Sequence, residues 1–310
     1  MALVVVFGAA GRQGTAQVRQ LKRAEHEVRA ISRRTDPFLG EDFGAVEIRP
    51  ADIRDMDSVV AAMEGADAVF YTHPVKAAVG LVEAVTIVGQ AAVKANIKRV
   101  VWNTSSWIPD RSGESFSYAG NTAGINALWR TGAPATVFGS VLFMDNLLTN
   151  WAFPFIVGEG RFVYPHKPHL ECSWISLDDV AKFMIAAIDR PDLEGAWLNI
   201  GGPQILHPPQ VAEILSEAVG RQIKYDPSTP KQFAKNLCDA FGEDMSKEER
   251  RVTEAFMEAF YTFNNDTTQK PFRVDMGPVL ERIPIEMETM RQWAARQEWR
   301  LTNKPRPPAG

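Results

Sequence analysis

Residues 4–14 read VVVFGAAGRQG, and this stretch decides the fold of the chain. The apolar run Leu3–Phe7 is followed directly by three glycines at spacings of three, Gly8, Gly11 and Gly14, and then by an amphipathic pattern of helical period. A strand that passes through such a turn into a helix is typical of a nucleotide-binding loop. The first glycine permits the turn, the second lets the backbone approach a diphosphate, and the third lets the helix pack closely.

The rest of the first half repeats the alternation of strand and helix. Short, valine-rich apolar runs alternate with longer amphipathic segments, as expected for strands that are buried on both faces. This alternation predicts right-handed βαβ units and an α/β fold with a doubly wound parallel sheet of Rossmann type. The predicted strands are 3–7, 27–31, 45–49, 68–72, 99–103 and 136–139, and the predicted helices are 12–24, 55–64, 77–95 and 120–131.

After residue 145 the pattern changes to aromatics among prolines and glycines, and from Pro208 onward it is mainly helical. Residues Cys172–Ser176 and the helical pattern after them predict a return to the sheet, with a further strand at 197–200. We therefore expect a nucleotide-binding domain at 1–150, completed by roughly 173–202, and a smaller, mainly helical substrate domain from roughly 151–172 and 203–300. The polar, proline-rich residues 303–310 are expected to form a flexible tail.

Composition excludes several classes of protein. The chain has 310 residues, of which 45% are hydrophobic and 23% charged, and its net charge of −4 argues against a nucleic-acid partner. No apolar segment approaches the roughly 20 residues that span a bilayer, and the N-terminal run lacks the charged start of a signal peptide. The two cysteines do not suggest a disulfide framework, so we expect a cytoplasmic protein, either a monomer or a homodimer.

The end of the second predicted strand indicates which cofactor is preferred. An acidic residue there would bind the ribose 2′-hydroxyl of NAD, whereas arginine accommodates a 2′-phosphate. The chain has Ser32, Arg33 and Arg34 at this point, and Arg12 inside the glycine loop can add a further positive charge. We therefore predict NADP(H) in preference to NAD(H), although these arginines would also suit a solvated surface.

Other strand ends supply further candidates for cofactor binding. Asp52 and Ile53 are placed to meet the edge and face of an adenine, and Thr72, His73 and Pro74 are placed to flank a ribose, although each also suits an ordinary loop. The complete predicted cofactor set is Gly8, Ala10, Gly11, Arg12, Gln13, Gly14, Ser32, Arg33, Arg34, Asp52, Ile53, Thr72, His73, Pro74, Asn103 and Thr104.

With these residues the chain resembles the NmrA-like branch of the atypical short-chain dehydrogenase/reductases, which includes isoflavone-reductase-like and triphenylmethane-reductase-like enzymes. The resemblance rests on VVVFGAAGRQG at 4–14, ISRR at 31–34, NTSS at 103–106 and GAPATVFGSVLFMDNL at 132–147, and it covers residues 1–220. It implies an NADP(H)-binding domain, a small substrate domain and hydride transfer to aromatic or quinone-like substrates. It also implies that a member of the family can bind NADP without turnover, as a regulator.

The chain departs from the family at the expected proton donor. The resemblance implies a Tyr-x-x-x-Lys pair, but Tyr118 is followed four residues later by Thr122, and the position that often carries lysine or histidine is Asn121. Relatives often have Arg-Pro where this chain has Gly139–Ser140. Highly electrophilic acceptors need mainly hydride geometry, so the absence does not exclude catalysis. The predicted catalytic candidates are Tyr118, Ser105, Ser106, His73 and Asn121.

An apolar pocket for a conjugated substrate would need aromatic walls. The candidates, each of which also suits an ordinary hydrophobic core, are Trp107, Leu142, Phe143, Trp151, Phe155, Tyr164 and Trp174. His166, His169 and Cys172 lack the spacing and the fourth ligand of a metal site, so no metal is predicted.

Three hypotheses for function follow. The first is an NADPH-dependent reductase of a small aromatic, quinone-like or conjugated substrate. The second is a non-catalytic NADP(H) sensor that binds a partner protein through its helical domain. The third is a lyase or isomerase on the same scaffold.

Overall fold

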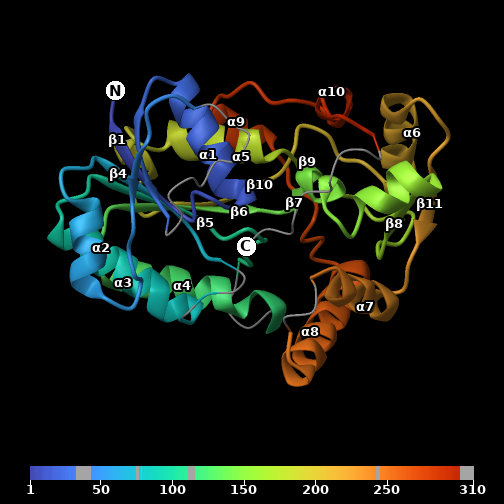
Figure 1. Ribbon diagram of the computed structural model, residues 1–310, viewed down its shortest axis with the longest axis horizontal. Coiled ribbons are helices and arrows are strands. Elements are labelled where there is room, and N and C mark those ends of the chain that lie inside the picture. Colours follow the sequence, from blue (N-terminus) through green and yellow to red (C-terminus); the bar gives the residue numbers. More distant parts are fainter. Residues whose placement is uncertain (33–42, 75–76, 78, 111–115, 242–244, 301–310) are drawn as a thin grey trace.

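The computed structural model describes residues 1–32, 43–74, 77, 79–110, 116–241 and 245–300, and a seven-stranded sheet forms its centre (Figure 1). The strand order is β10-β6-β5-β4-β1-β2-β3, and every neighbouring pair is parallel. The order reverses at β1, and open sheets of this kind bind ligands in the crevice at the reversal. The predicted doubly wound α/β fold is confirmed. The strands are β1 (Leu3–Phe7), β2 (Glu27–Ile31), β3 (Glu47–Arg49), β4 (Ala68–Thr72), β5 (Arg99–Asn103), β6 (Ala135–Ser140) and β10 (Trp197–Ile200).

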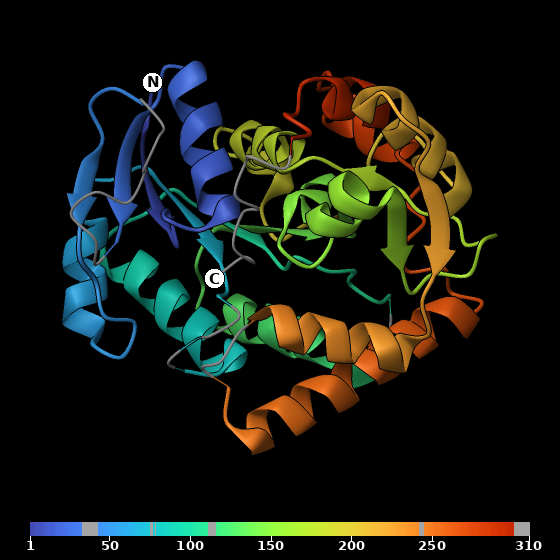
Figure 2. The ribbon, with the colours of Figure 1, turned by 45° about the vertical axis from the view of Figure 1, so that its right-hand side comes forward.

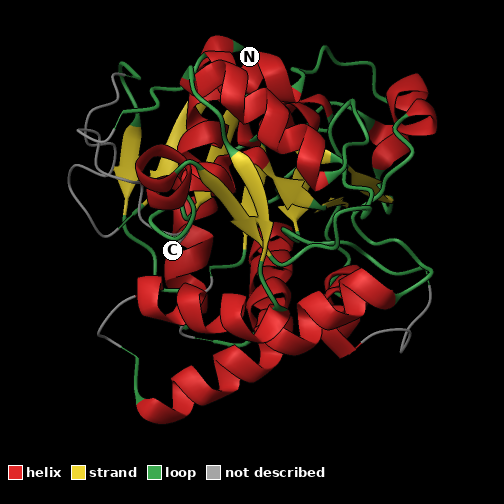
Figure 3. Ribbon diagram, turned by 90° about the vertical axis from the view of Figure 1, so that its right-hand side faces the viewer, coloured by secondary structure: helices red, strands yellow, loops and turns green. Residues whose placement is uncertain are grey.

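Helices cover both faces of this sheet (Figure 3). Along β1 the side chains alternate between two cores, with Val4 and Val6 in one and Val5 in the other. The central strands β1, β4, β5 and β6 are apolar along most of their length because both of their faces are buried. On one face α1 packs against α5, and the other face carries three helices. The helices are α1 (Arg12–Arg23) and α5 (Leu177–Ala186) on the first face, and α2 (Met56–Met63), α3 (Leu81–Lys94) and α4 (Ala119–Arg130) on the second.

Elements on the right-hand side of Figure 1, among them α6, α7, α8, β8 and β11, form what we call the second part of the molecule. Here β8 (Arg161–Tyr164) pairs with β11 (Lys224–Pro227), and β7 (Leu142–Phe143) pairs with β9 (Trp174–Ile175). The orange helices α7 and α8 lie side by side at the lower edge of Figure 2. The other helical elements are η1 (Phe116–Tyr118), η2 (Met144–Leu148), η3 (Phe155–Glu159), η4 (Pro191–Leu193), α6 (Pro208–Val219), α7 (Pro230–Phe241), α8 (Lys247–Asp266), α9 (Gly277–Arg282) and α10 (Met290–Ala295).

One segment differs from its prediction. The pattern at Cys172–Ser176 predicts a return to the main sheet, but β9 pairs with β7 in a separate two-stranded sheet, and the chain joins the main sheet only at β10. A two-residue strand is too short for its sequence pattern to specify a partner. The division into domains stays a prediction, and residues 303–310 lie outside the described residues. Within the described ranges, none of the helices combines the length and the apolar character required to cross a bilayer.

Candidate functional site

The glycine turn between β1 and α1 has the geometry that a diphosphate needs. Gly8 has a φ of 70°, and its carbonyl accepts the Gly11 N–H at 2.9 Å. A Cβ on Gly14 would lie 2.2 Å from the Gly8 carbonyl oxygen, so only glycine lets α1 approach β1 this closely. Helix α1 begins after Gly11, which has no side chain to cap it. The N–H groups of its first turn can therefore bind an anion.

A cavity of about 600 Å³ opens beside this turn, at the carboxyl ends of β1 and β2. Predicted cofactor residues from four segments meet there, and the volume lies in the range of small-molecule sites. The structure thus gathers residues that are widely separated in the sequence. They are Gly8 after β1, Ser32 after β2, Asp52 and Ile53 after β3, and Pro74 after β4.

Arg54 also lines the cavity, and the sequence analysis did not identify it. Its Nη2 atom lies 2.6 Å from Asp52 Oδ2, and its backbone N–H donates to Asp52 Oδ1 at 3.0 Å. Both side chains are exposed, so this ion pair contributes little to stability. The pair instead places one positive and one negative group at the cavity. In the sequence, the spacing Asp-x-Arg was the feature that could have indicated that Arg54 lies beside Asp52 at the cavity.

Of the three arginines that the sequence assigns to a 2′-phosphate, the structure describes only Arg12. Arg12 donates from Nη1 to the Asp145 carbonyl at 2.8 Å and from Nη2 to Asn146 Oδ1 at 3.2 Å. These bonds join the glycine turn to η2. Arg33 and Arg34 lie outside the described residues.

Beyond the glycine turn, an amide and hydroxyl network joins α1 to the ends of β5 and β6. The fully buried Asn103 donates to Gln13 Oε1 at 2.7 Å, and its Oδ1 accepts from the Ser140 hydroxyl at 2.8 Å and the Ser105 N–H at 3.2 Å. Gln13 Nε2 in turn donates to Ser105 Oγ at 2.9 Å. Ser105 has a φ of 60°, a strained conformation for a residue with a side chain. Asn103 therefore sets the positions of Gln13 and Ser105, and Ser140 joins this network although the sequence did not predict it.

Asn121, at the start of α4, holds the segment that follows Ser105. Its Nδ2 donates to Ser106 Oγ at 2.8 Å and to the Trp107 carbonyl at 2.9 Å. Thr104 Oγ1 donates to the Ser106 carbonyl at 2.6 Å. The structure therefore brings Asn121, Ser105 and Ser106 together at the carboxyl edge of β5.

Tyr118 makes its polar contact elsewhere. It is buried in η1, and its hydroxyl donates to Asn264 Oδ1 of α8 at 2.7 Å. Its ring packs edge-on against Trp107, with centroids 5.2 Å apart. Burial raises the pKa of Tyr118 well above its usual value, so the phenol stays neutral. The hydroxyl joins η1 to α8 rather than bonding to Ser105, Ser106 or Asn121.

Thr72 is the last residue of β4, and His73 and Pro74 follow it, next to the glycine turn. Thr72 Oγ1 accepts from Nε2 of the buried Gln17 at 3.2 Å, which links β4 to α1. His73 is half-buried, and this burial lowers its pKa, so its imidazole is neutral. Of these three residues, Pro74 lines the cavity.

The residues predicted to line a substrate pocket are divided between the hydrophobic core and its edge. Tyr164 and Trp174 are fully buried, with ring centroids 5.4 Å apart, and have no surface for a ligand in this conformation. Phe155 lies under the Arg161 guanidinium, 5.3 Å from the ring centroid. The others keep between 5% and 9% of their surface exposed: Trp107, Leu142, Phe143 and Trp151.

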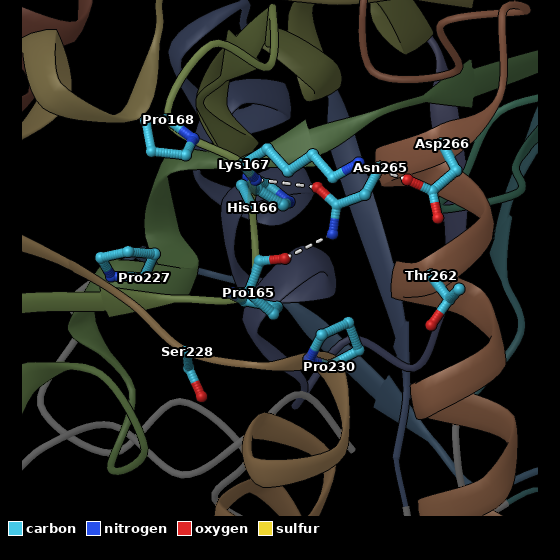
Figure 4. Close-up of a pocket in the computed structure, with 10 residues that line it drawn as sticks. All are labelled: Pro165, His166, Lys167, Pro168, Pro227, Ser228, Pro230, Thr262, Asn265 and Asp266. Atoms are coloured by element: carbon cyan, nitrogen blue, oxygen red, sulfur yellow. Dashed lines mark hydrogen bonds and ion pairs between the residues drawn. The ribbon is translucent and has the colours of Figure 1, made fainter.

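A second cavity, of about 320 Å³, lies between β8, β11 and α8 (Figure 4). Asn265 spans it by accepting the Lys167 N–H at 2.9 Å and donating to the Pro165 carbonyl at 2.6 Å. His166 is buried at its back, where burial lowers its pKa to about 3, and its Nδ1 lies 3.7 Å from Cys172 Sγ. Among the described residues, no group of three or more His, Cys, Asp or Glu side chains is arranged to hold a metal ion.

Comparisons with known proteins agree with this fold. The NAD(P)H azoreductase of Xenophilus azovorans is 27% identical over 251 residues, which cover 78% of this chain and 85% of the azoreductase. The regulator NmrA in complex with NAD has a TM-score of 0.75 at 16% identity, covering 95% of this chain and 94% of NmrA. The NADPH-dependent quinone oxidoreductase QOR2 of Escherichia coli, with NADPH, has a TM-score of 0.71 at 16% identity, covering 94% and 98%. The model of the NmrA-like family matches residues 1–298, and the chain therefore belongs to the NmrA-like family.

Proposed function

We propose that this protein is an NADPH-dependent reductase that transfers hydride to a small aromatic, quinone-like or conjugated substrate. The observation that carries the proposal is the convergence of predicted cofactor residues on one cavity beside the glycine turn. The names of two relatives, an NAD(P)H azoreductase and an NADPH-dependent quinone oxidoreductase, describe the same class of reaction.

Ser32 and the Asp52–Ile53 pair would hold the adenosine of a dinucleotide, and the N–H groups at the N-terminus of α1 would hold its diphosphate. The residues at the ends of β5 and β6 would hold the nicotinamide, which would supply the hydride. The preference for NADPH follows from Ser32, Arg33 and Arg34, which offer no carboxylate to a ribose 2′-hydroxyl.

The polar groups at the end of β5 orient the substrate. The hydroxyls of Ser105 and Ser106, held by Gln13 and Asn121, bind a carbonyl or quinone oxygen beside the nicotinamide. Positioning can supply much of the reduction in barrier for an electrophilic acceptor. Tyr118 has a structural role in this proposal, because its hydroxyl bonds to Asn264.

A panel of quinones, azo compounds, enones, imines and aromatic ketones tests the proposal by the loss of NADPH absorbance. We expect at least one conjugated acceptor to be reduced, and an Asn121→Ala variant to be slower because Ser106 loses its partner. The matched control is Gln232→Ala, since Gln232 bonds to Asn236 on the exposed surface of α7. Micromolar binding of NADPH without turnover of any acceptor would contradict the proposal.

A non-catalytic NADP(H) sensor is the second candidate. The contacts of Tyr118 and Asn121 favour it, because one side chain bonds to α8 and the other holds a loop, so neither is arranged as a proton donor. NmrA itself is described as a negative transcriptional regulator. Binding of NADPH without turnover, together with a partner that distinguishes NADPH from NADP⁺, would favour the sensor.

A further inference from the structure

Tyr71 and His73 form a hydrogen-bonded pair at the end of β4. Residues two apart in a strand point to the same face, and here the Tyr71 hydroxyl lies 2.8 Å from His73 Nδ1. The Tyr71 ring is 3% exposed and packs edge-on against Phe7, with ring centroids 6.1 Å apart. The cavity is lined by two neighbours of the pair, Phe7, which packs against Tyr71, and Pro74, which follows His73.

The direction of this hydrogen bond follows from burial. A buried phenol needs an acceptor, and in the described part of the chain the Tyr71 hydroxyl has no partner other than His73. Burial raises the pKa of Tyr71 and lowers that of His73, so both groups are neutral. A neutral imidazole accepts at one ring nitrogen and donates at the other. Tyr71 therefore donates to Nδ1, and the proton of His73 is on Nε2.

The Nε2–H group of His73 can donate a hydrogen bond to a ligand. Nδ1 is occupied by Tyr71, and Nε2 has no hydrogen-bond partner among the described residues. His73 lies between Thr72 and Pro74, where the end of β4 passes the glycine turn, and a Cβ on Gly8 would lie 4.0 Å from the Thr72 carbonyl. The acceptors that a dinucleotide would bring to this place are ribose and diphosphate oxygens.

We propose that Tyr71 is a positioning residue that fixes His73 as the Nε2–H tautomer, so that His73 donates a hydrogen bond to a ribose or diphosphate oxygen of the nicotinamide dinucleotide. The second half of this statement rests on the proposed function. The first half concerns the protein alone and can be tested without a cofactor.

The tautomer is measured by NMR on protein labelled with ¹⁵N-histidine, where long-range ¹⁵N–¹H correlations distinguish a protonated from an unprotonated ring nitrogen. The chain has five histidines, and the His73 signals are assigned by their loss in a His73→Gln variant. We expect an unprotonated Nδ1 and a protonated Nε2 in the wild type, and a shift toward the Nδ1–H form in Tyr71→Phe. The control is Tyr225→Phe, which removes a hydroxyl that bonds to the His166 carbonyl in the second part of the molecule.

Two results would overturn the positioning role of Tyr71. One is a proton on Nδ1 of His73 in the wild type, and the other is a set of His73 signals that does not change in Tyr71→Phe. The variant keeps the buried ring, so it should fold, and its thermal unfolding is compared with that of Tyr225→Phe. If Tyr71→Phe does not fold, the tautomer of the wild type alone decides this half.

Cofactor affinity tests the second half, by titration with NADPH. Loss of one neutral hydrogen bond weakens binding by about two- to tenfold, and we expect a change of this size in Kd for His73→Asn and a smaller one for Tyr71→Phe, which keeps Nε2 but no longer fixes its proton. The amide nitrogen of glutamine can replace Nε2, whereas that of asparagine replaces Nδ1, so His73→Gln should bind NADPH more tightly than His73→Asn. Equal losses in the two variants would overturn the donor role. A wild-type protein that binds no NADPH would overturn the proposed function, while the tautomer would still decide the role of Tyr71.

Discussion

A substitution of Gly14 by alanine would add one methyl group between α1 and the sheet and push the two apart. The added Cβ would lie 2.2 Å from the Gly8 carbonyl oxygen and 2.5 Å from Ala9 Cα, and backbone atoms cannot move aside as a flexible side chain can. We expect Gly14→Ala to lower the free energy of unfolding by about 1–3 kcal/mol and to weaken NADPH binding, because the helix N-terminus moves away from the turn. Urea unfolding and NADPH titration measure the two effects.

Gly120→Ala is the matched control for this prediction. Gly120 also lies in a helix, but its Cβ would contact only Leu81 Cδ2 at 3.7 Å, an ordinary packing distance. This control should gain about 0.5–1 kcal/mol of stability, because alanine is the better helix former. If Gly14→Ala behaves in the same way, the close approach of α1 is not needed for folding.

The residues of the site were predictable where local sequence determines the geometry. The glycine turn and the strand ends follow from the position of each residue in a βα unit, so Gly8, Ser32 and Asp52 were identified from the sequence. The contact of Tyr118 with Asn264 joins residues 146 apart, and no local pattern encodes such a pairing. The same limit explains why the sequence did not indicate the contact of Arg12 with Asp145.

The side chain of Asp178, in α5, links this helix to α1 and α10. Its carboxylate lies 2.8 Å from Arg19 of α1 and 3.1 Å from Arg296 at the end of α10. Burial alone would raise the pKa of Asp178, but the two arginines outweigh it and hold the pKa below the ordinary 3.8. The carboxylate therefore stabilises the fold above the ordinary pKa, and this stabilisation is lost as the pH falls through the folded value.

We expect Asp178→Asn to reduce the free energy of unfolding by about 1–3 kcal/mol at neutral pH, since two charged hydrogen bonds are weakened. The difference from the wild type should shrink below the ordinary pKa of 3.8, because the wild-type carboxylate is then protonated as well. Asp192→Asn, in a pair with Arg190 at the surface, should change stability little at any pH. A deficit for Asp178→Asn that is equally large at low pH would contradict the assignment.

The elements themselves were predicted to different degrees. Strands β1, β2, β4, β5 and β10 have the predicted bounds, because each is a short run in which apolar residues predominate. Strands β8 and β11 were missed, since a parallel pair of four-residue strands more than fifty residues apart leaves little pattern in the sequence.

In the whole molecule, the two parts share one hydrophobic core. The core cluster on the α1 face of the sheet runs from Val4 and Leu21 through Leu142 and Trp151 to Phe233. A second part that packs on the sheet in this way brings its own residues to the carboxyl edge of the strands. We propose that the substrate binds beside Trp107, Leu142 and Phe143, which keep 5–9% of their surface exposed.

Transfer of deuterium from the cofactor to an acceptor measures the proposed hydride transfer itself. Wild-type protein is incubated with NADPH that carries deuterium at the reactive C4 position, together with the best acceptor from the panel, and the product is examined by mass spectrometry. If the protein is a reductase and the hydride is added to a carbon atom of the acceptor, one deuterium from the cofactor appears in the product. If the added hydrogen exchanges with water, NADP⁺ and the reduced acceptor form in equal amounts. NADPH that binds at micromolar concentration and is recovered unoxidised with every acceptor would contradict the account.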